Sequence, residues 1–326
     1  MWTRRGALAA GLGSAALLAA GRAGAQWSPA RPVTIVVPYP AGGPTDVLAR
    51  IVAREIAPGL GQNVVVENQP GASGALGTRR VARADPDGLT LVLSTNQTHA
   101  TNISLLKDGG GYDPVTDFTT LGGLADLQHL LVVRKELPAR SVAELMALAR
   151  AASPRLTCAS TGVGAASHLT MELFKARTGI ELVHVPYRGS APLIQDMVGG
   201  RVDLSFATVP TVLGQIQSGD VRGLAVASPN PSPQVPDLPT LAREGVPGVE
   251  ADAWLAIFAP AGLDPAIRAR YRDLLAAALA KPDVKASVEK LGTLVNWREP
   301  DAFAAFQRAD VGRWAEIIRT AKVTAE

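Results

Sequence analysis

Short apolar runs alternate with amphipathic segments along most of the chain. In the amphipathic segments apolar residues recur at the spacing of a helix that packs one face on a sheet. The apolar runs predict strands at Val33–Val37, Val64–Glu67, Leu89–Ser94, Leu130–Arg134, Leu156–Ala159, Leu182–Tyr187, Leu204–Ala207, Leu224–Ala227 and Leu255–Ala259. Helices are predicted at Val47–Ile56, Gly74–Arg83, Val142–Ala151, Leu169–Ala176, Ala191–Val198 and Val209–Gln217, before two long C-terminal helices. This alternation predicts an α/β fold with parallel-rich sheets and flanking helices.

The breaks between these elements indicate two lobes with a crossing strand at each boundary. The segment Pro229–Pro239, which holds five prolines, is an extended connector. We expect a discontinuous first lobe of residues 26–127 and 229–326, and a second lobe of residues 128–228. At 326 residues the chain is long enough for two domains of ordinary size.

Residues 1–25 have the pattern of an export signal. Arg4 and Arg5 precede a stretch rich in alanine and glycine, and Ala23-Gly24-Ala25 forms a small-residue cleavage site. Paired arginines fit twin-arginine export and also an ordinary secretory signal. The stretch is too short and too weakly apolar for a stable membrane span. We therefore expect cleavage near Ala25-Gln26 and a periplasmic protein.

The formal net charge of +3 originates in this leader, which holds three arginines and no acid. The rest of the chain carries 29 basic residues (32 − 3) and 29 acidic residues. No basic run with interleaved aromatic residues occurs, so a nucleic-acid partner is not expected. The single cysteine, Cys158, excludes an internal disulfide, and the four histidines lack zinc-like spacing. We predict neither a metal nor a cofactor.

Three predicted strand–loop–helix units have small residues where the helix begins. They are Tyr39–Asp46, Ser160–His168 and Arg188–Pro192. Backbone N–H groups at a helix start point outward at the positive end of the helix dipole and suit an anion. Taken alone, each loop fits an ordinary turn whose glycines serve its geometry. Because such loops gather at one crevice at the carboxyl ends of the strands, the three together predict an anion site.

Polar residues beside the loops complete the predicted site. Asn96 and His99 follow the third strand, and Asp46 lies in a first helical turn, where it caps the helix or orients the pocket. Arg188 suits bidentate pairing with a carboxylate or a solvated surface position. The predicted ligand-binding residues are Tyr39, Pro40, Ala41, Gly42, Gly43, Thr45, Asp46, Asn96, His99, Thr161, Gly162, Val163, Gly164, Ser167, His168, Tyr187, Arg188, Gly189 and Ser190.

Competing readings of these loops each lack a required part. Gly162–Ser167 is one residue short of the dinucleotide fingerprint, and the next strand ends in His184–Tyr187 without an acid for the ribose hydroxyls. A GxSxG elbow, which a hydrolase serine needs, is absent from the sequence. Cys158 lies near His168, as a thiol nucleophile would, but a strand cysteine is more often a small buried hydrophobe.

Motifs in a fixed order along nearly the whole exported chain add a more specific prediction. They are Val36–Asp46, Glu67–Gly74, Asp85–Gly88, Tyr112–Phe118, Ser167–Leu169, His184–Gly189, Pro236–Thr240 and Phe258–Gly262. In this order they resemble the Bug family, the extracytoplasmic binding receptors of tripartite tricarboxylate transporters. The resemblance implies a monomeric, two-lobed periplasmic binding protein of type II with a ligand cleft between its lobes.

The resemblance also implies how a ligand is held. A carboxylate would be gripped largely by backbone and water at Tyr39–Thr45, while Thr161–His168 and Arg188–Ser190 complete the grip. Ala41 stands where the family frequently has a second proline, and Ser190 stands where glycine is frequent. Because Ser190 adds a hydroxyl near the expected pocket, ligand preference is expected to differ from that of close relatives.

The function implied is capture of a small carboxylate by hinge closure and its delivery to a transporter permease. The carboxylate would be a di- or tricarboxylate, an acidic amino acid or an aromatic acid. One alternative is a sensing receptor that docks a membrane signalling protein. A less favoured alternative is an enzyme acting on a carboxylate, for which the chain offers no matched acid–base pair. We therefore expect no enzymatic activity.

Overall fold

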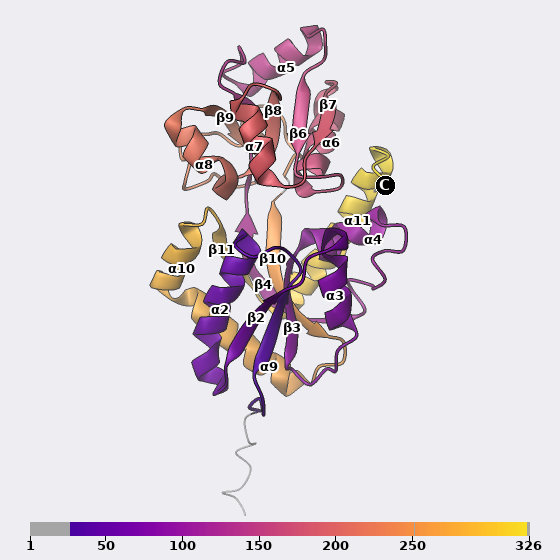
Figure 1. Cartoon of the computed structure of the whole chain (residues 1–326), viewed down its shortest axis with the longest axis vertical. Helices are drawn as coiled ribbons and strands as arrows, with labels where there is room; N and C mark the ends of the chain where they lie inside the picture. Colours follow the sequence, from indigo (N-terminus) through magenta and orange to yellow (C-terminus); the bar gives the residue numbers. More distant parts are fainter. Residues whose placement is uncertain (1–26, 251, 325–326) are drawn as a thin grey trace, which may run out of the picture.

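Two mixed β-sheets, stacked along the long axis of the molecule, organise the chain (Figure 1). The computed structural model describes residues 27–250 and 252–324. The predicted two-lobed α/β fold is confirmed, since each sheet has its own strands and its own covering helices (Figure 1). The predicted export signal at residues 1–25 and its cleavage bond lie outside the described residues.

The first sheet has six strands in the order β11-β4-β10-β3-β1-β2. Strand β1 pairs in parallel with β2 and β3, while β10 is antiparallel to both β3 and β4. Its strands are β1 (Val33–Val37), β2 (Val64–Asn68), β3 (Thr90–Thr95), β4 (Phe118–Leu127), β10 (Ala253–Pro260) and β11 (Leu294–Arg298). The accompanying helices are α2 (Pro44–Leu60), α3 (Ala75–Ala82), α4 (Asn102–Leu105), α9 (Pro265–Ala280), α10 (Pro282–Glu289) and α11 (Pro300–Thr320). Two short turns, 3-10 helical Ala72–Gly74 and π-helical Gln97–Thr101, precede α3 and α4.

The second sheet has five strands in the order β7-β6-β8-β5-β9. Strand β6 is parallel to β7 and β8, and β5 is antiparallel to β8 and β9. Its strands are β5 (His129–Arg134), β6 (Thr157–Ser160), β7 (Val183–Pro186), β8 (Leu204–Thr208) and β9 (Val221–Val226). The helices are α5 (Val142–Ala151), α6 (Ala166–Thr178), α7 (Ser190–Val198) and α8 (Val209–Ser218).

Every predicted strand and helix overlaps an observed element of the same kind, but the prediction of parallel-rich sheets needs correction. Both sheets are mixed, because β5 and β10 run antiparallel to their neighbours. These two strands begin just after the chain crosses from one sheet to the other. The prediction also missed strands β4 and β11, the π-helical turn with α4, and helix α10.

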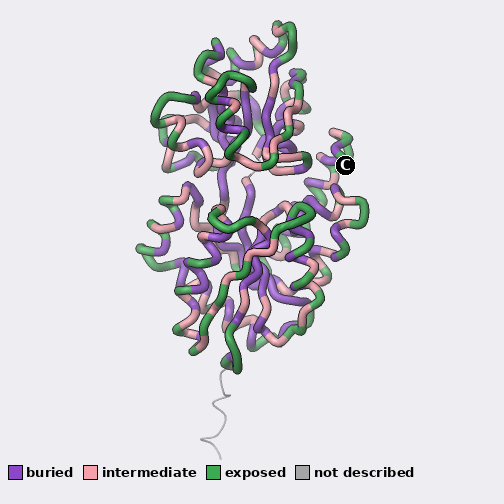
Figure 2. The backbone as a smooth tube through the Cα atoms, viewed as in Figure 1, coloured by how far each residue is buried: buried purple, intermediate pink, exposed green. Residues whose placement is uncertain are grey.

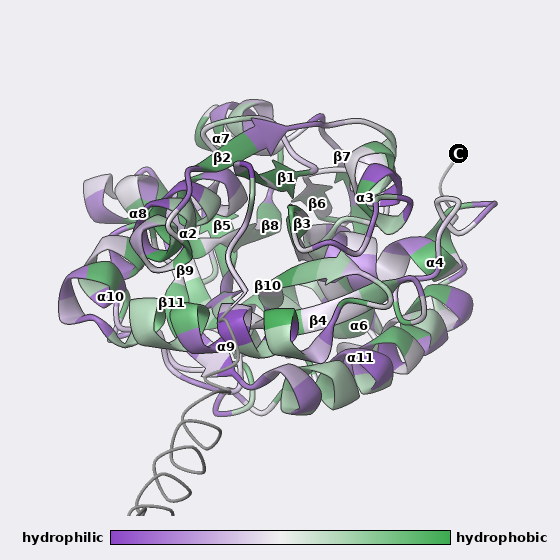
Figure 3. Cartoon of the chain, turned by 90° about the horizontal axis from the view of Figure 1, so that it is seen from below, coloured by the Kyte–Doolittle hydropathy of each residue, from purple (hydrophilic) through white to green (hydrophobic). Residues whose placement is uncertain are grey.

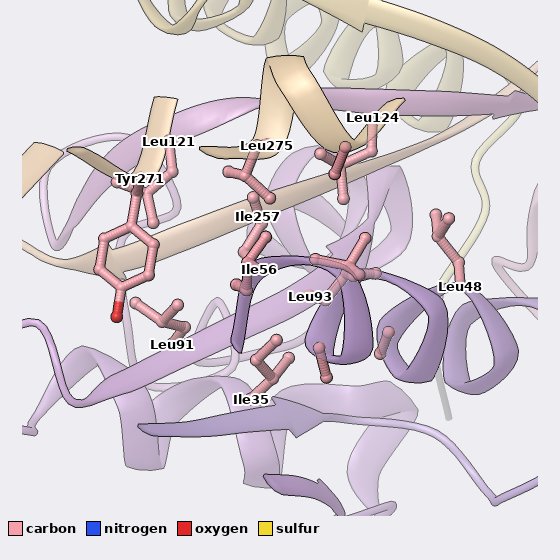
Figure 4. Packing of buried hydrophobic residues seen from close by; sticks show 14 of the residues in the cluster. Ile35, Leu48, Ile56, Leu91, Leu93, Leu121, Leu124, Ile257, Tyr271 and Leu275 are labelled. Atoms are coloured by element: carbon pink, nitrogen blue, oxygen red, sulfur yellow. The ribbon is translucent and has the colours of Figure 1, made fainter. Parts of the chain in front are cut away.

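The core of the first half lies between its sheet and helices α2 and α9. Ile35 and Leu91 from the sheet meet Ile56 of α2, while Tyr271 and Leu275 approach from α9 (Figure 4). Burial of each such aliphatic side chain contributes about 1.5–3 kcal/mol, which gives this half a rigid base for its loops. Figure 2 shows the same division, with buried strands inside and exposed residues on the outer helical turns and loops.

The outer helices are amphipathic, as their packing on a sheet requires. Seen from below, α11 carries alternating hydrophilic and hydrophobic bands, whereas β10, which it helps to cover, is mainly hydrophobic (Figure 3). Phe303 and Trp314 of α11 are buried, and the Trp314 indole N–H donates to Asp310 Oδ2 at 3.0 Å. Among the described residues, no helix combines the length and hydropathy that a membrane span needs.

The chain passes between the sheets twice, and the two crossings lie together. Gln128, between β4 and β5, donates from Nε2 to Ser228 Oγ at 3.0 Å, and Ser228 donates to Asp252 Oδ2 at 2.7 Å. Burial, with Asp126 nearby, raises the pKa of the Asp252 carboxyl to about 7, against the opposing effect of Ser228 and two arginines. Two consecutive hydrogen bonds, from Gln128 to Ser228 and from Ser228 to Asp252, therefore link the two crossings.

The predicted lobe boundaries remain predictions, and the structure offers a refinement of the second. Leu241, Val246 and Val249 belong to the buried cluster of the five-stranded sheet, and Thr240 bridges to Val226 of β9. We propose that the second boundary lies close to Ala253, where β10 begins, rather than at 228/229.

Candidate functional site

A cleft of about 700 Å³ lies between the helix starts of the two halves. The first half contributes the loop before α2 and the turn after α10, and the second half contributes α7 and α8. Its lining includes Gly42, Gly43, Pro44, Val47, Ser190, Ala191, Ile194, Pro210, Thr211, Gln215, Lys290, Leu291 and Gly292. A smaller cavity of about 30 Å³ adjoins it, because Ser190 and Thr211 line both. Thr161, Ser167 and His129 also line this smaller cavity.

The first loop is held in shape by Asp46. Its Oδ2 accepts from the backbone N–H of Gly42 at 2.9 Å and from Arg50 Nε at 3.1 Å. Its Oδ1 accepts from Asn68 Nδ2 at 3.0 Å, and Asn68 also donates to the carbonyl of Tyr39 at 3.1 Å. Burial opposes ionisation, but these donors together lower the pKa of Asp46 below its usual value. Asp46 therefore organises the loop.

Helix α2 begins at this loop with open donors. Gly43 is its N-cap residue, and among the described residues no side chain caps it. Pro44 occupies the first helical turn, where its missing N–H is not needed. Gly42 has φ 85°, a left-handed conformation that glycine adopts without strain. The following N–H groups are consequently available to an anion at the cleft.

The second loop joins β6 to α6 and is tied down by its own side chains. Thr161 N–H donates to Ser167 Oγ at 3.0 Å, and Gly164 N–H donates to His168 Nδ1 at 3.0 Å. A Cβ on Gly164 would lie 1.9 Å from Leu105 Cδ2, so this loop of the second half packs tightly against α4 of the first. The loop is therefore both part of the cavity wall and a contact between the halves.

The third loop ends in the N-cap glycine of α7. Gly189 has φ 103°, and Ser190, the first residue of α7, lines both cavities. Tyr187 turns its hydroxyl to Asp196 Oδ2 at 2.8 Å, and burial, with Asp196, raises its pKa to about 12. Arg188 is exposed on the loop and lies outside the lining of both cavities.

Helix α8 adds a fourth helix start that the sequence prediction missed. Thr208 is its N-cap residue, and the hydroxyls of Thr208 and Thr211 lie 2.6 Å apart. Among the described residues, none of α2, α6, α7 and α8 has a side-chain cap. Ser141 caps α5 and Asp264 caps α9, while α3, α10 and α11 also lack a side-chain cap from the described part of the chain, so the cleft is marked by the gathering of uncapped starts at one place. Four uncapped helix starts from both halves thus surround the two adjoining cavities.

The structure brings together part of the predicted set. Gly42, Gly43, Thr161, Ser167 and Ser190 line one or both cavities. The remaining residues of the three loops lie beside these without lining either cavity; they are Tyr39, Pro40, Ala41, Thr45, Asp46, Gly162, Val163, Gly164, His168, Tyr187, Arg188 and Gly189. Several of them hold a loop in place, as Tyr39 does by bonding its hydroxyl to Thr95 Oγ1 at 2.7 Å.

Asn96 and His99, both predicted to bind the ligand, are buried just after the end of the third strand. His99 is fully buried and stacks on Phe258 with ring centroids 3.9 Å apart. Burial lowers its pKa to about 3, so it is a neutral core residue. Asn96 is buried at the start of the π-helical turn and lines neither cavity. The third strand ends in a turn that folds these side chains inward, which the strand pattern does not reveal.

The described residues offer neither a reactive thiol nor a group of side chains placed to bind a metal. Cys158 is fully buried on β6, and burial raises the pKa of its thiol well above the usual range. Within residues 27–250 and 252–324, no group of three histidine, cysteine or acidic side chains is placed to hold a metal ion. The polar groups that line the cleft are backbone groups at the helix starts, hydroxyls such as those of Ser190 and Thr211, and the side chains of Gln215 and Lys290.

A family comparison agrees with this geometry. The family model described as "Tripartite tricarboxylate transporter family receptor" matches residues 48–323. The chain belongs to this receptor family. It is therefore a solute-binding protein, as the sequence motifs predicted, and its family is one of binding proteins rather than enzymes.

Solved structures place this receptor among periplasmic binding proteins. The periplasmic binding protein BugD is 37% identical with a TM-score of 0.78, covering 91% of this chain and 100% of its own. Rpa4515 of R. palustris, solved with adipate, is 36% identical with a TM-score of 0.82, covering 91% and 99%. MatC of Rhodopseudomonas palustris, solved with bound malate, is 33% identical with a TM-score of 0.77, covering 89% and 99%.

Proposed function

We propose that this receptor captures a small dicarboxylate or a related organic acid in the cleft between its two halves. The observation that carries the proposal is the set of four uncapped helix starts, α2 from one half and α6, α7 and α8 from the other. Each offers backbone donors and a positive dipole end, so a carboxylate is bound without a buried, unpaired cation. Adipate and malate, the ligands named for two similar receptors, are both dicarboxylic acids.

The cleft also has the features that a second carboxylate and a carbon chain require. Val47, Ile194 and Leu291 give it apolar walls, while Gln215 and Lys290 add polar groups. We propose that one carboxylate lies against the helix starts and that the rest of the ligand extends along these walls toward Lys290. Ser190 adds a hydroxyl to the lining and contributes to ligand preference.

Binding is proposed to act through closure of the hinge. A ligand that touches both halves makes more contacts in the closed state, and this difference shifts the equilibrium toward closure. The closed receptor would then dock on a membrane permease of the tripartite tricarboxylate type and deliver the acid. We place this event in the periplasm, expect a monomer, and expect the bound acid to leave chemically unchanged.

A thermal-shift screen of the purified receptor tests the proposal. Adipate, malate, citrate, aspartate and benzoate would be added singly, after co-purified ligand has been removed by unfolding and refolding. A ligand at a hundred times its Kd stabilises the folded state by about 2.7 kcal/mol, which gives a clear rise in Tm. Folded receptor that responds to none of these acids would contradict the proposal.

A pair of glycine variants ties the response to the cleft. A Cβ on Gly43 meets nothing closer than 3.8 Å, so Gly43→Val has room in the ligand-free protein but places its methyl groups at the α2 start. We expect at least a tenfold loss of affinity with little change in the ligand-free Tm. The matched control is Gly312→Val on the exposed side of α11, where a Cβ meets open space and affinity should stay unchanged.

A further inference from the structure

Two stacked histidines lie beside the second loop of the cleft. His168 is in the first turn of α6 and His184 is in β7, and their rings are 3.8 Å apart and 6° from parallel. Two imidazolium rings at this separation repel each other strongly in a partly buried site. The arrangement therefore requires that the pair carry no more than one charge, and it suits two neutral rings.

The ring nitrogens contact the loop at both of its ends. His168 Nδ1 accepts from the Gly164 N–H, so this nitrogen is unprotonated and the ring proton sits on Nε2. His184 Nε2 lies 2.6 Å from Ser160 Oγ, which accepts from the Gly162 N–H at 3.2 Å. The stacked pair thus fixes one glycine directly and the other through Ser160.

This loop forms part of the proposed ligand site. The two anchored glycines lead directly into α6. The first N–H groups of this helix have no side-chain cap among the described residues. Thr161 and Ser167, which line the smaller cavity, are bonded to each other across the loop. A change in the Gly162–Gly164 turn would move these groups relative to the cavity.

We propose that His168 and His184 are positioning residues: as a neutral pair they hold the second loop in its ligand-binding shape, and a proton on His168 Nδ1 releases it. A protonated Nδ1 is a donor that faces the donor N–H of Gly164, so the bond between them is lost. This inference rests on the carboxylate-binding function proposed above and adds a pH limit to it.

The surroundings of the pair determine where that limit falls. Burial lowers the pKa of His168 to about 4, and His184 and Lys175 add to the effect. Burial also lowers the pKa of His184, again with a contribution from Lys175. Glu172 faces His168 Nε2 at 3.8 Å but is engaged by Lys175 at 2.9 Å, and Cys158 is the β6 partner of His184. We expect constant affinity from pH 8 to 5 and a loss below about pH 4.

The test compares three variants by calorimetric titration with adipate and with malate between pH 7 and pH 3.5. His168→Asn places a side-chain carbonyl near the position of Nδ1 and does not titrate. His168→Leu removes the acceptor, and Ser160→Ala removes the link from His184. At pH 7 we expect His168→Leu and Ser160→Ala to bind about fivefold to tenfold more weakly, the usual effect of one lost hydrogen bond, and His168→Asn to stay near wild type.

The ratio of wild-type Kd to His168→Asn Kd is the decisive readout, because protonation of the ligand affects both proteins equally. We expect this ratio to rise severalfold as the pH falls to 3.5, below the pKa of His168. A constant ratio, or wild-type affinity in both His168→Leu and Ser160→Ala, would overturn this inference and leave the proposed function standing. A wild-type receptor that binds neither adipate nor malate, nor any other acid of the screen, at pH 7 would overturn the proposed function and this inference with it. Ser160→Ala changes little volume and keeps the test valid should His168→Leu fold poorly.

Discussion

Single residues at the cleft act mainly by fixing backbone, and Asp46 is the clearest case. Its two oxygens accept from Gly42, Arg50 and Asn68, so one carboxylate ties the first loop to the start of α2 and the end of β2. The sequence places an acid in this first turn but does not reveal its partners, because Asn68 comes from a neighbouring strand. The spacing therefore predicted the residue and an orienting role, but not the partners through which it acts.

Replacing Asp46 with alanine should loosen this loop. Three donors lose their acceptor, and because Gly42 and Arg50 are exposed, they can bond to water instead. A lost hydrogen bond usually destabilises by about 0.5–1.5 kcal/mol, so we expect a lower Tm and at least a fivefold weaker affinity. Asp283→Ala is the matched control, since Asp283 is also a first-turn acid but lies on the exposed start of α10. Thermal unfolding and calorimetry measure both effects. Equal behaviour of the two variants would show that Asp46 acts only through the helix dipole.

Asp252 at the crossing of the two halves should make stability depend on pH. Its folded-state pKa of about 7 lies above the ordinary value of 3.8, so the folded state binds its proton more tightly than the unfolded state. The resulting stability is fully present below about pH 4 and is lost as the pH rises toward 7 and above. Asp252→Asn keeps an acceptor for Ser228 and removes the charge.

We expect Asp252→Asn to raise the Tm at pH 8 and to have little effect at pH 4.5. Each unit of pKa shift corresponds to about 1.4 kcal/mol, so the gain at pH 8 is at most a few kcal/mol. Thermal unfolding of both proteins across this range gives the comparison. An advantage of the variant that does not change with pH would contradict the raised pKa.

At the scale of elements, the sequence predicted the strands and helices whose apolar residues recur regularly. It missed the strands that form only because distant parts of the chain pack on them. Strand β4 contains Gly122 and Gly123, which weaken any strand pattern, yet a Cβ on Gly123 would lie 2.4 Å from Phe303. The glycines are needed because Trp297 and α11 pack on this strand, and that packing cannot be seen locally. Strand β11 is only partly buried and has no regular alternation, so it was missed as well.

The same limit explains the missing parts of the site. Thr208 and Thr211 stand where β8 passes directly into α8, and this junction has no glycine loop to mark it in the sequence. Lys290 joins the cleft from the end of α10, a helix that was not predicted, and it comes close only through the fold of the first half. Local motifs thus found the anion loops, while the far wall required the tertiary structure.

Gly123→Ala tests the close packing of β4 under α11. The added methyl group meets Phe303 in a filled core, and overpacking of this kind usually destabilises by about 1–3 kcal/mol. Gly312→Ala in α11 is the matched control: its Cβ meets open space, and alanine favours a helix over glycine by up to about 1 kcal/mol. Denaturant unfolding should therefore show opposite signs for the two variants. A neutral Gly123→Ala would mean that Phe303 can move aside.

At the scale of the whole molecule, the two halves meet beside the cleft and are joined by the crossing strands. Gly164 packs on Leu105 in one place, and a Cβ on Gly292 would lie 2.9 Å from the backbone nitrogen of Pro210 in another. Leu169 of α6 also belongs to a buried cluster of the first half. Because the halves already touch, we expect the proposed closure to be a small rotation about Gln128 and Asp252 that changes how these contacts fit.

Small-angle scattering can detect this rotation directly. We expect the radius of gyration to fall when wild-type receptor is saturated with the acid that gives the largest thermal shift, because closure brings the long axis of the molecule inward. Gly43→Val at the same acid concentration should keep the ligand-free profile, whereas Gly312→Val should close like wild type. Binding by calorimetry with superimposable scattering curves would leave capture intact and contradict closure. In that case the permease would have to distinguish the loaded receptor by the ligand itself or by the local shape of the cleft, because the arrangement of the halves would be the same in both states.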